Sequence, residues 1–161
     1  MGRLQRTIAE VGWTEQVPQL ARDARVARAL EAMRREAHDS VLVVDGERLV
    51  GIFTTRDFLN RVAARRLDPQ DVVIGDVMTP APRTLAPDDP VAFAINWMAV
   101  EGFRNVPIVD TAGKLLGVLT IWDVMRQLGE LFGELEATPR AVRTQDEISA
   151  VIAMTDVGGD G

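Results

Sequence analysis

The sequence predicts an α+β protein built from two copies of one β-α-β-β-α unit, with short N- and C-terminal extensions. Two observations predict this fold class. The 161-residue chain repeats itself internally. In each copy, a stretch of helical apolar spacing is followed by two short apolar runs with a turn between them, which is the pattern of a helix and a β-hairpin.

The repeat becomes visible when the sequence is shifted by 65 residues. Eleven positions in the range 20–45 then match identical residues in the range 85–110, and a shift of 66 adds four more identities over 49–57. Chance alone would give only a few matches, so the chain contains a duplicated unit. A single unit of about 50 residues buries little surface, which favours two copies that share a core.

The first copy begins with a short extended segment, Gln19–Ala21, before a helix. Apolar residues at helical spacing then indicate the helix, and the run Val41–Val44 indicates a buried strand. The turn Asp45-Gly46-Glu47 has hairpin chemistry and leads to a second strand at Leu49–Phe53. A closing helix follows, so this copy reads as β-α-β-β-α.

The second copy repeats this order. Thr84–Ala86 is predicted to be extended, a helix follows it, and Val106–Val109 and Leu115–Leu119 are predicted strands around the turn Asp110–Gly113. The closing helix is longer and amphipathic, with its apolar residues at Ile121, Val124, Met125, Leu128, Leu131, Phe132 and Leu135.

The two copies set the expected organisation of the chain. Residues 1–16 form an N-terminal arm, 17–66 the first domain, 67–76 a linker, and 77–130 the second domain. Residues 131–161 are expected to form a C-terminal helical extension and a frayed tail. Thr144 and Glu147 are spaced as a capping box that would open one more helix there.

Composition excludes several classes of function. The chain has no cysteine and one histidine, His38, so thiolate catalysis, cysteine zinc sites and multi-histidine metal sites lack their parts. The formal net charge of −6 disfavours binding to nucleic acid or to anionic membranes. No apolar run approaches the roughly 20 residues of a membrane span, and no signal peptide is visible, so the expected location is the cytoplasm.

Several motifs together resemble those of the CBS-domain family. The second copy carries Val77-Met78-Thr79-Pro80, Val106–Asp110 and Gly117–Asp123, and the first carries Val41–Asp45 and Gly51–Asp57. The resemblance covers about residues 17–130. It implies two domains packed about a pseudo-twofold axis, with two clefts that commonly bind AMP, ATP, S-adenosylmethionine or NAD.

The resemblance also implies the site residues. Asp57 and Asp123 would hold the ribose hydroxyls, because a carboxylate can accept hydrogen bonds from both hydroxyls of a cis-diol. Each lies where a strand enters a helix, and the first amides of a helix favour a phosphate. The candidate ligand-binding residues are Thr54, Arg56, Asp57, Thr120, Trp122, Asp123, Arg104, Asn105, His38, Leu20, Ala21, Leu85 and Ala86.

These residues have different expected roles. Arg56 and Arg104 offer guanidinium forks to a phosphate, and the segments Leu20-Ala21 and Leu85-Ala86 offer an apolar slot for adenine. Trp122 would stack on a base, or instead pack and narrow the second cleft. His38 is either a helix-end residue near the mouth of a cleft or a ligand contact.

The Thr-x-x-Asp motif has a structural alternative. Thr54 and Thr120 would then be helix N-caps, with Asp57 and Asp123 at the third helical position closing a local capping box. Duplicated helices need duplicated caps, so the occurrence of the motif in both copies does not separate the two interpretations. Both roles can coexist.

The expected function is a non-catalytic regulatory module. An adenosine nucleotide would bind between the repeats as a regulatory ligand, with no cofactor required, and would change their relative orientation. The expected partners are a second copy in a homodimer and a regulated enzyme or transporter. The alternative is a ligand-free dimerisation scaffold, and a more distant one is a DNA-associated regulator. The identity of the nucleotide and the occupancy of each cleft stay open.

Overall fold

The structure is a computed structural model that describes residues 6–132. The chain divides into two compact units, one ending at Ile121 and the other beginning at Trp122. The capping box expected at Thr144 and Glu147, and the extension and tail expected beyond residue 132, lie outside the described residues. The predicted α+β architecture with two repeats is confirmed.

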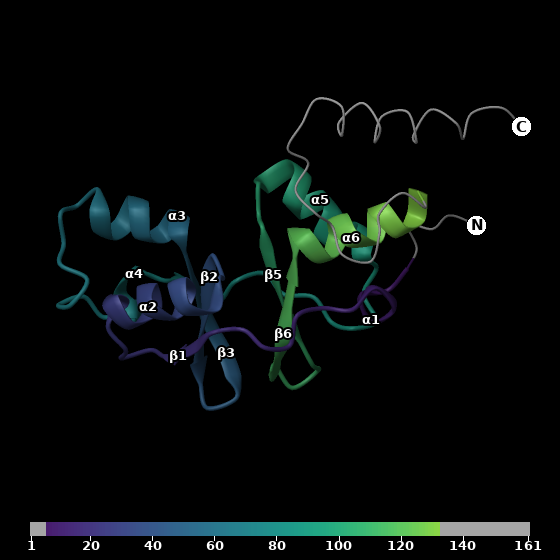
Figure 1. The fold of residues 1–161 in the computed structure, drawn as a ribbon. Helices are drawn as coiled ribbons and strands as arrows, with labels where there is room; N and C mark the ends of the chain where they lie inside the picture. Colours follow the sequence, from purple (N-terminus) through teal and green to yellow (C-terminus); the bar gives the residue numbers. More distant parts are fainter. Residues whose placement is uncertain (1–5, 133–161) are drawn as a thin grey trace, which may run out of the picture. The chain divides into compact units, whose positions relative to one another are not determined.

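The first repeat forms a four-stranded sheet with helices on one side (Figure 1). Strand β1 is parallel to β2, β2 is antiparallel to β3, and β3 is antiparallel to β4. After β3 the chain enters a short α-helix that continues as a π-helical turn. The elements are β1 (Gln19–Ala21), α2 (Val26–Glu36), β2 (Ser40–Asp45), β3 (Arg48–Thr54), α3 (Thr55–Phe58), η2 (Leu59–Ala63), α4 (Ile74–Val77) and β4 (Thr79–Pro80).

The core of this repeat lies between the sheet and its helices. Helix α2 buries Val26, Ala29 and Met33 at helical spacing, and they pack in one cluster with Val41 and Phe53 of the strands. The opposite face of α2 is rich in exposed arginine, so the helix is amphipathic. Its apolar face therefore covers one side of the sheet.

The second repeat has the same order of helix and hairpin, but its sheet has two strands where the first repeat has four. Helix α5 (Val91–Glu101) precedes the antiparallel pair β5 (Asn105–Val109) and β6 (Leu115–Thr120). The segment 84–86, expected to be extended, makes only one bridge, from Leu85 to Ile108. Leu85 N–H donates to the Pro107 carbonyl and the Leu85 carbonyl accepts from the Val109 N–H, so the segment pairs in parallel with β5, as β1 pairs with β2. The Ala86 N–H donates to the Asp89 carboxylate at 2.7 Å, and a turn follows the segment at Pro87.

The segment before each repeat pairs with the other repeat. Helix α1 (Ile8–Val11) precedes the first repeat, yet Ile8 N–H donates to the Asp89 carbonyl, and Thr14 bridges to Val118 of β6. The equivalent contact is made by β4, where Thr79 pairs with Ile52 of β3. The expected arm and the first residues of the expected second domain therefore act as reciprocal connecting segments, each of which adds an edge to the sheet of the other copy.

The close approach of these segments explains why the Gly-x-x-Thr motif of each repeat begins with glycine. A Cβ at Gly117 would collide with the carbonyl oxygen of Thr14, and a Cβ at Gly51 would collide with the side chain of Met78. Only glycine leaves room for a backbone to cross at such a distance. The motif glycines thus have a packing role.

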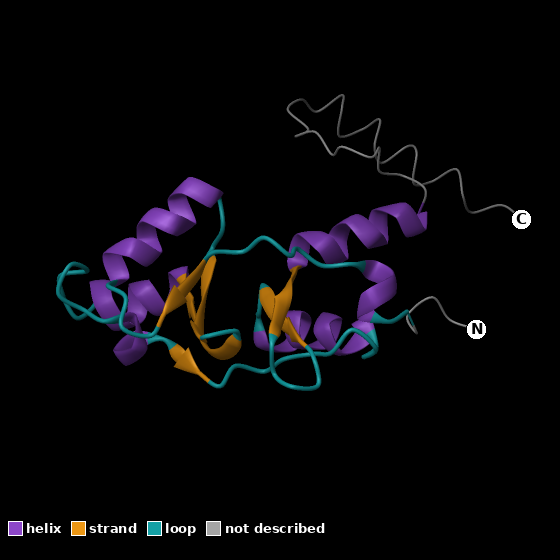
Figure 2. Cartoon of the chain, turned by 90° about the horizontal axis from the view of Figure 1, so that it is seen from below, coloured by secondary structure: helices purple, strands orange, loops and turns teal. Residues whose placement is uncertain are grey.

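The two copies are related by a pseudo-twofold axis. Arg48 and Lys114 occupy equivalent positions and bridge to each other. Reciprocal hydrogen bonds flank them: Leu115 N–H donates to the Glu47 carbonyl at 3.0 Å, and Leu49 N–H donates to the Gly113 carbonyl at 3.4 Å. Contacts between equivalent residues occur only where a symmetry axis passes, so the axis runs between the two hairpins (Figure 2).

Helix α6 (Ile121–Phe132) starts at the boundary between the units. Within it, Arg126 Nη1 donates to Asp123 Oδ1 at 3.4 Å. The expected continuation of its apolar pattern to Leu135 lies outside the described residues. In residues 6–132, no helix combines the length and the apolar character needed to cross a membrane.

Candidate functional site

A pocket of about 740 Å³ opens beside the corner where β3 enters α3. Side chains from this corner, from β4 and from the loop between α5 and β5 line it, so both repeats contribute. Its apolar wall consists of Ile52, Leu59, Pro82, Phe103 and Pro107. Its polar wall consists of Asp39, Thr54, Thr55, Arg56, Asp57, Arg61, Thr79, Arg83, Arg104 and Asn105.

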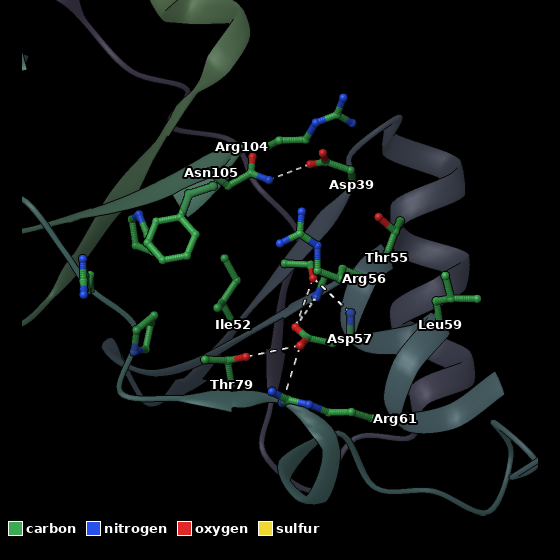
Figure 3. A pocket seen from close by; sticks show the side chains of 16 residues that line it. Asp39, Ile52, Thr55, Arg56, Asp57, Leu59, Arg61, Thr79, Arg104 and Asn105 are labelled. Carbon is green, nitrogen blue, oxygen red and sulfur yellow. Dashed lines mark hydrogen bonds and ion pairs between the residues drawn. The ribbon is translucent and has the colours of Figure 1, made fainter. Parts of the chain in front are cut away.

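Asp57 is the buried charge of this pocket, with 8% of its surface exposed. Its Oδ2 accepts from the Thr54 N–H at 3.0 Å and from the Thr54 hydroxyl at 3.1 Å. Its Oδ1 accepts from the Thr79 hydroxyl at 3.2 Å and lies 3.5 Å from Arg61 Nη1 (Figure 3). Both oxygens therefore have partners, and a buried carboxylate requires them.

The local sequence explains how Asp57 reaches this position. Thr54 is the N-cap of α3, and its hydroxyl accepts from the Asp57 N–H, while the Asp57 carboxylate accepts from the Thr54 N–H. This is a reciprocal capping box, so the structural role expected for Thr-x-x-Asp is present in the first repeat. The same carboxylate lines the pocket, so the cap also directs a negative charge toward it.

Arg61 ties this corner to the connecting segment. Its Nη1 donates to the Val77 carbonyl at 2.9 Å and to the Met78 carbonyl at 2.6 Å. It lies four residues after Asp57 on the continuing helix, and it forms an ion pair with that residue. Asp57, Arg61 and Thr79 thus form one network that joins the first repeat to the chain entering the second.

The four arginines of the pocket differ in their partners. Arg83 forms an ion pair with Glu101, and its guanidinium lies 5.5 Å from the ring centroid of Trp97. Within residues 6–132, neither Arg56 nor Arg104 makes a side-chain hydrogen bond or ion pair. Arg56 extends toward the middle of the pocket, whereas the guanidinium of Arg104 lies at its rim (Figure 3). These two cations keep their hydrogen-bonding capacity for a ligand.

A contact across the two repeats closes one side of the pocket. Asn105 Nδ2 donates to Asp39 Oδ1 at 2.7 Å (Figure 3). Asp39 precedes β2 and Asn105 begins β5, so this hydrogen bond links equivalent ends of the two repeats. It holds the pocket wall in place and leaves the other oxygen of each side chain available.

Five of the residues predicted from the sequence meet in this pocket: Thr54, Arg56, Asp57, Arg104 and Asn105. His38, Leu20, Ala21, Leu85 and Ala86 lie outside its lining. Leu20 packs against the core of the first repeat, and Leu85 is buried. His38 N–H donates to the Met33 carbonyl, which fits the helix-end role expected for it.

The remaining predicted residues belong to the second Thr-x-x-Asp motif. Thr120 ends β6, and Trp122 and Asp123 lie in the first turn of α6. None of them lines the pocket of the first motif. Their ligand-binding role stays a prediction.

Several lining residues were not predicted from the sequence. Thr79 belongs to a motif that carried the family resemblance, but its link to Asp57 depends on β4 joining the first sheet. Phe103 could have been found as the repeat equivalent of His38. Arg61 and Arg83 carried no sequence signal. Among the described residues, no group of histidine, aspartate and glutamate side chains is arranged to hold a metal ion.

A model of the CBS domain matches residues 14–64 and 74–130. The chain belongs to the CBS domain family. The two matched segments correspond to the two repeats, so the protein contains a pair of CBS domains.

Several known proteins are similar to this chain over more than half of its length. An uncharacterized protein of Methanopyrus kandleri is 34% identical over 95 residues, which cover 58% of this chain and 48% of that protein. A CBS domain protein from Pyrobaculum aerophilum complexed with AMP is 25% identical, with a TM-score of 0.66 over 78% of this chain and 99% of that chain. CBSX2 in complex with AMP is 26% identical, with a TM-score of 0.67 over 78% of this chain and 97% of that chain.

The chain spans only part of the curated relatives. It covers 48% of the Methanopyrus protein and 62% of a 17.7 kDa protein of Acidianus ambivalens. It covers 13% of the meiotically up-regulated gene 70 protein of Schizosaccharomyces pombe.

Proposed function

We propose that this CBS pair is a non-catalytic regulatory module that binds an adenosine nucleotide in the pocket beside Asp57. The observation that carries the proposal is the arrangement of that pocket. A buried carboxylate, a hydroxyl and two guanidinium groups that have no partner among the described residues lie beside an apolar wall. Two structural relatives of 25% and 26% identity are described in complex with AMP, which supports this ligand class.

The ribose would bind at Asp57 and Thr79. A carboxylate offers about four acceptor positions, and three are used by the Thr54 N–H, the Thr54 hydroxyl and the Thr79 hydroxyl. The fourth, on Oδ1, would accept one ribose hydroxyl. The Thr79 oxygen, which donates to Asp57, still has lone pairs to accept the neighbouring hydroxyl of a cis-diol.

The other parts of a nucleotide also find matching groups. The base would lie on the apolar wall between Ile52 and Pro107. The phosphate would lie near the first turn of α3, where Arg56 extends into the pocket (Figure 3). The ligand would thereby touch both repeats, so binding would change their preferred orientation, and a regulated enzyme or transporter would sense the change.

Titration calorimetry tests this proposal. AMP, ATP, S-adenosylmethionine and NAD are titrated into the purified chain, with inosine monophosphate as the control for the base. We expect measurable heat for at least one adenosine compound and a weaker affinity for that compound in Asp57→Asn. Absence of heat for all four compounds would refute the proposal. Asp23→Asn is the matched control, because Asp23 is exposed and does not line the pocket.

A ligand-free dimerisation scaffold is the second candidate, and one observation favours it. On α5, Phe93 is 51% exposed and Val100 is 74% exposed, seven residues apart on one helix face. Their equivalents on α2 are Arg28 and Arg35, so the apolar face is particular to the second repeat. A homodimer through this face is compatible with nucleotide binding. Light scattering of the purified chain would detect it, and Phe93→Arg would dissociate it.

A further inference from the structure

We propose that the pocket beside Asp57 selects adenosine ligands by the negative charge of their phosphate, so that AMP and ATP bind far more tightly than adenosine or S-adenosylmethionine. This inference rests on the proposed function and specifies its ligand class. It further assigns the phosphate-recognising charge to Arg56 of the first repeat and Arg104 of the second.

The first support is the charge of the pocket. Four arginines line it against two aspartates, although the whole chain has a net charge of −6. Arg61 is neutralised by Asp57, and Arg83 is neutralised by Glu101. The guanidiniums of Arg56 and Arg104 stay without a partner in residues 6–132, and they face a single remaining carboxylate, Asp39. The pocket therefore attracts an anion within an acidic protein.

The second support is the difference between the repeats. At the positions equivalent to Arg56, Arg61 and Arg83, the other repeat carries Trp122, Gln127 and Pro18. None of these three side chains is charged. Because the Thr-x-x-Asp motif itself occurs in both copies, the arginines are an addition particular to one corner and are not required by the fold.

The third support is the chemistry of the competing ligands. A phosphomonoester carries close to two negative charges at pH 7 and matches the fork of a guanidinium. Adenosine has no charge, and S-adenosylmethionine has a sulfonium cation beside the ribose. Placing that cation near the unpaired Arg56 would be repulsive, whereas a phosphate at the same place would be held by charge-assisted hydrogen bonds.

The experiment compares four ligands on one protein. Affinities of AMP, ATP, adenosine and S-adenosylmethionine are measured by calorimetry at low and at high ionic strength. We expect AMP to bind at least about tenfold more tightly than adenosine, since hydrogen bonds to charged groups contribute about 1.5–3 kcal/mol each. Added salt should lower the affinity for AMP and leave the affinity for adenosine unchanged, because salt screens the contact between the phosphate and the arginines.

Three variants locate the effect. Arg56→Gln and Arg104→Gln should each lower the affinity for AMP and leave the affinity for adenosine unchanged. Arg56→Trp, which copies the equivalent position of the other repeat, should behave like Arg56→Gln. Arg34→Gln is the matched control, because Arg34 is an exposed arginine of α2 that does not line the pocket, and it should keep the wild-type preference.

The outcomes separate the two proposals. If adenosine or S-adenosylmethionine binds as tightly as AMP, the charge selection is wrong and nucleoside binding stands. If both Arg56→Gln and Arg104→Gln keep the full preference for AMP, the assignment to these residues is wrong. If no adenosine compound binds at all, both the proposed function and this inference fail.

Discussion

Replacing Asp57 by alanine should destabilise the protein even when no ligand is present. The substitution removes the acceptor of the Thr54 N–H, the Thr54 hydroxyl and the Thr79 hydroxyl at a site that is 8% exposed. Loss of a helix cap typically costs about 1 kcal/mol. Leaving a partly buried donor without its acceptor costs roughly 1–3 kcal/mol.

These contributions overlap, because the cap and the unsatisfied Thr54 amide are the same loss. The ion pair with Arg61 adds little, since the arginine side chain is 38% exposed and solvent screens it. We therefore expect a decrease in the free energy of unfolding of about 2–3 kcal/mol. Asp57→Asn keeps the shape and one acceptor oxygen, so its decrease should be about half as large.

Urea denaturation followed by circular dichroism measures this difference. Asp23→Ala is the control, because it removes an exposed aspartate and should change stability by less than about 0.5 kcal/mol. If Asp57→Ala unfolds at the wild-type urea concentration, the network around Asp57 does not stabilise the corner and our reasoning is wrong.

The contribution of Asp57 to ligand binding can be measured separately from its contribution to stability. The affinities of AMP and 2′,3′-dideoxy-AMP are compared in the wild type and in Asp57→Asn. Stability effects cancel, because both ligands meet the same folded protein. If Asp57 holds the ribose, the preference for AMP should shrink in the variant. An unchanged preference would assign Asp57 to the capping box alone.

Three further changes have expected outcomes. Gly117→Ala should lower the free energy of unfolding by about 1–3 kcal/mol, because the new Cβ meets the backbone of the arm at Thr14; a melting temperature equal to the wild type would contradict the close approach. Arg61→Gln should lower the free energy of unfolding by about 1–2 kcal/mol, because the carbonyl oxygens of Val77 and Met78 lose a charged donor. Urea denaturation measures the decrease, with Arg65→Gln, an exposed neighbour, as the control. Phe93→Arg should leave stability within about 0.5 kcal/mol and abolish any dimer seen by light scattering, and a dimer that persists would exclude this face of α5.

The sequence predicted those parts of the fold that depend on local pattern. Helical spacing and the hairpin turns placed α2, β2 and β3, because side chains within one element decide such structure. The segment 84–86 was predicted to be extended, but its ladder is limited to Leu85. The number of residues that pair there depends on the tertiary contact with β5, which a local pattern does not report.

The site was predicted only where its residues lie close together in sequence. Thr54, Arg56 and Asp57 belong to one short motif, and Arg104 and Asn105 are neighbours at the start of β5. Thr79 reaches Asp57 because β4 pairs with the sheet of the preceding repeat. That pairing is a tertiary event between segments more than 20 residues apart, and hydrophobic periodicity carries no information about it.

The reciprocal pairing of the Thr14 segment with β6 and of β4 with β3 has a consequence for how this protein unfolds. A single repeat cut from the chain would lack the segment that pairs with the edge of its sheet. The surface beside its motif glycine, Gly51 or Gly117, would then face water. Neither half can then melt while the other stays intact, and we expect one cooperative transition.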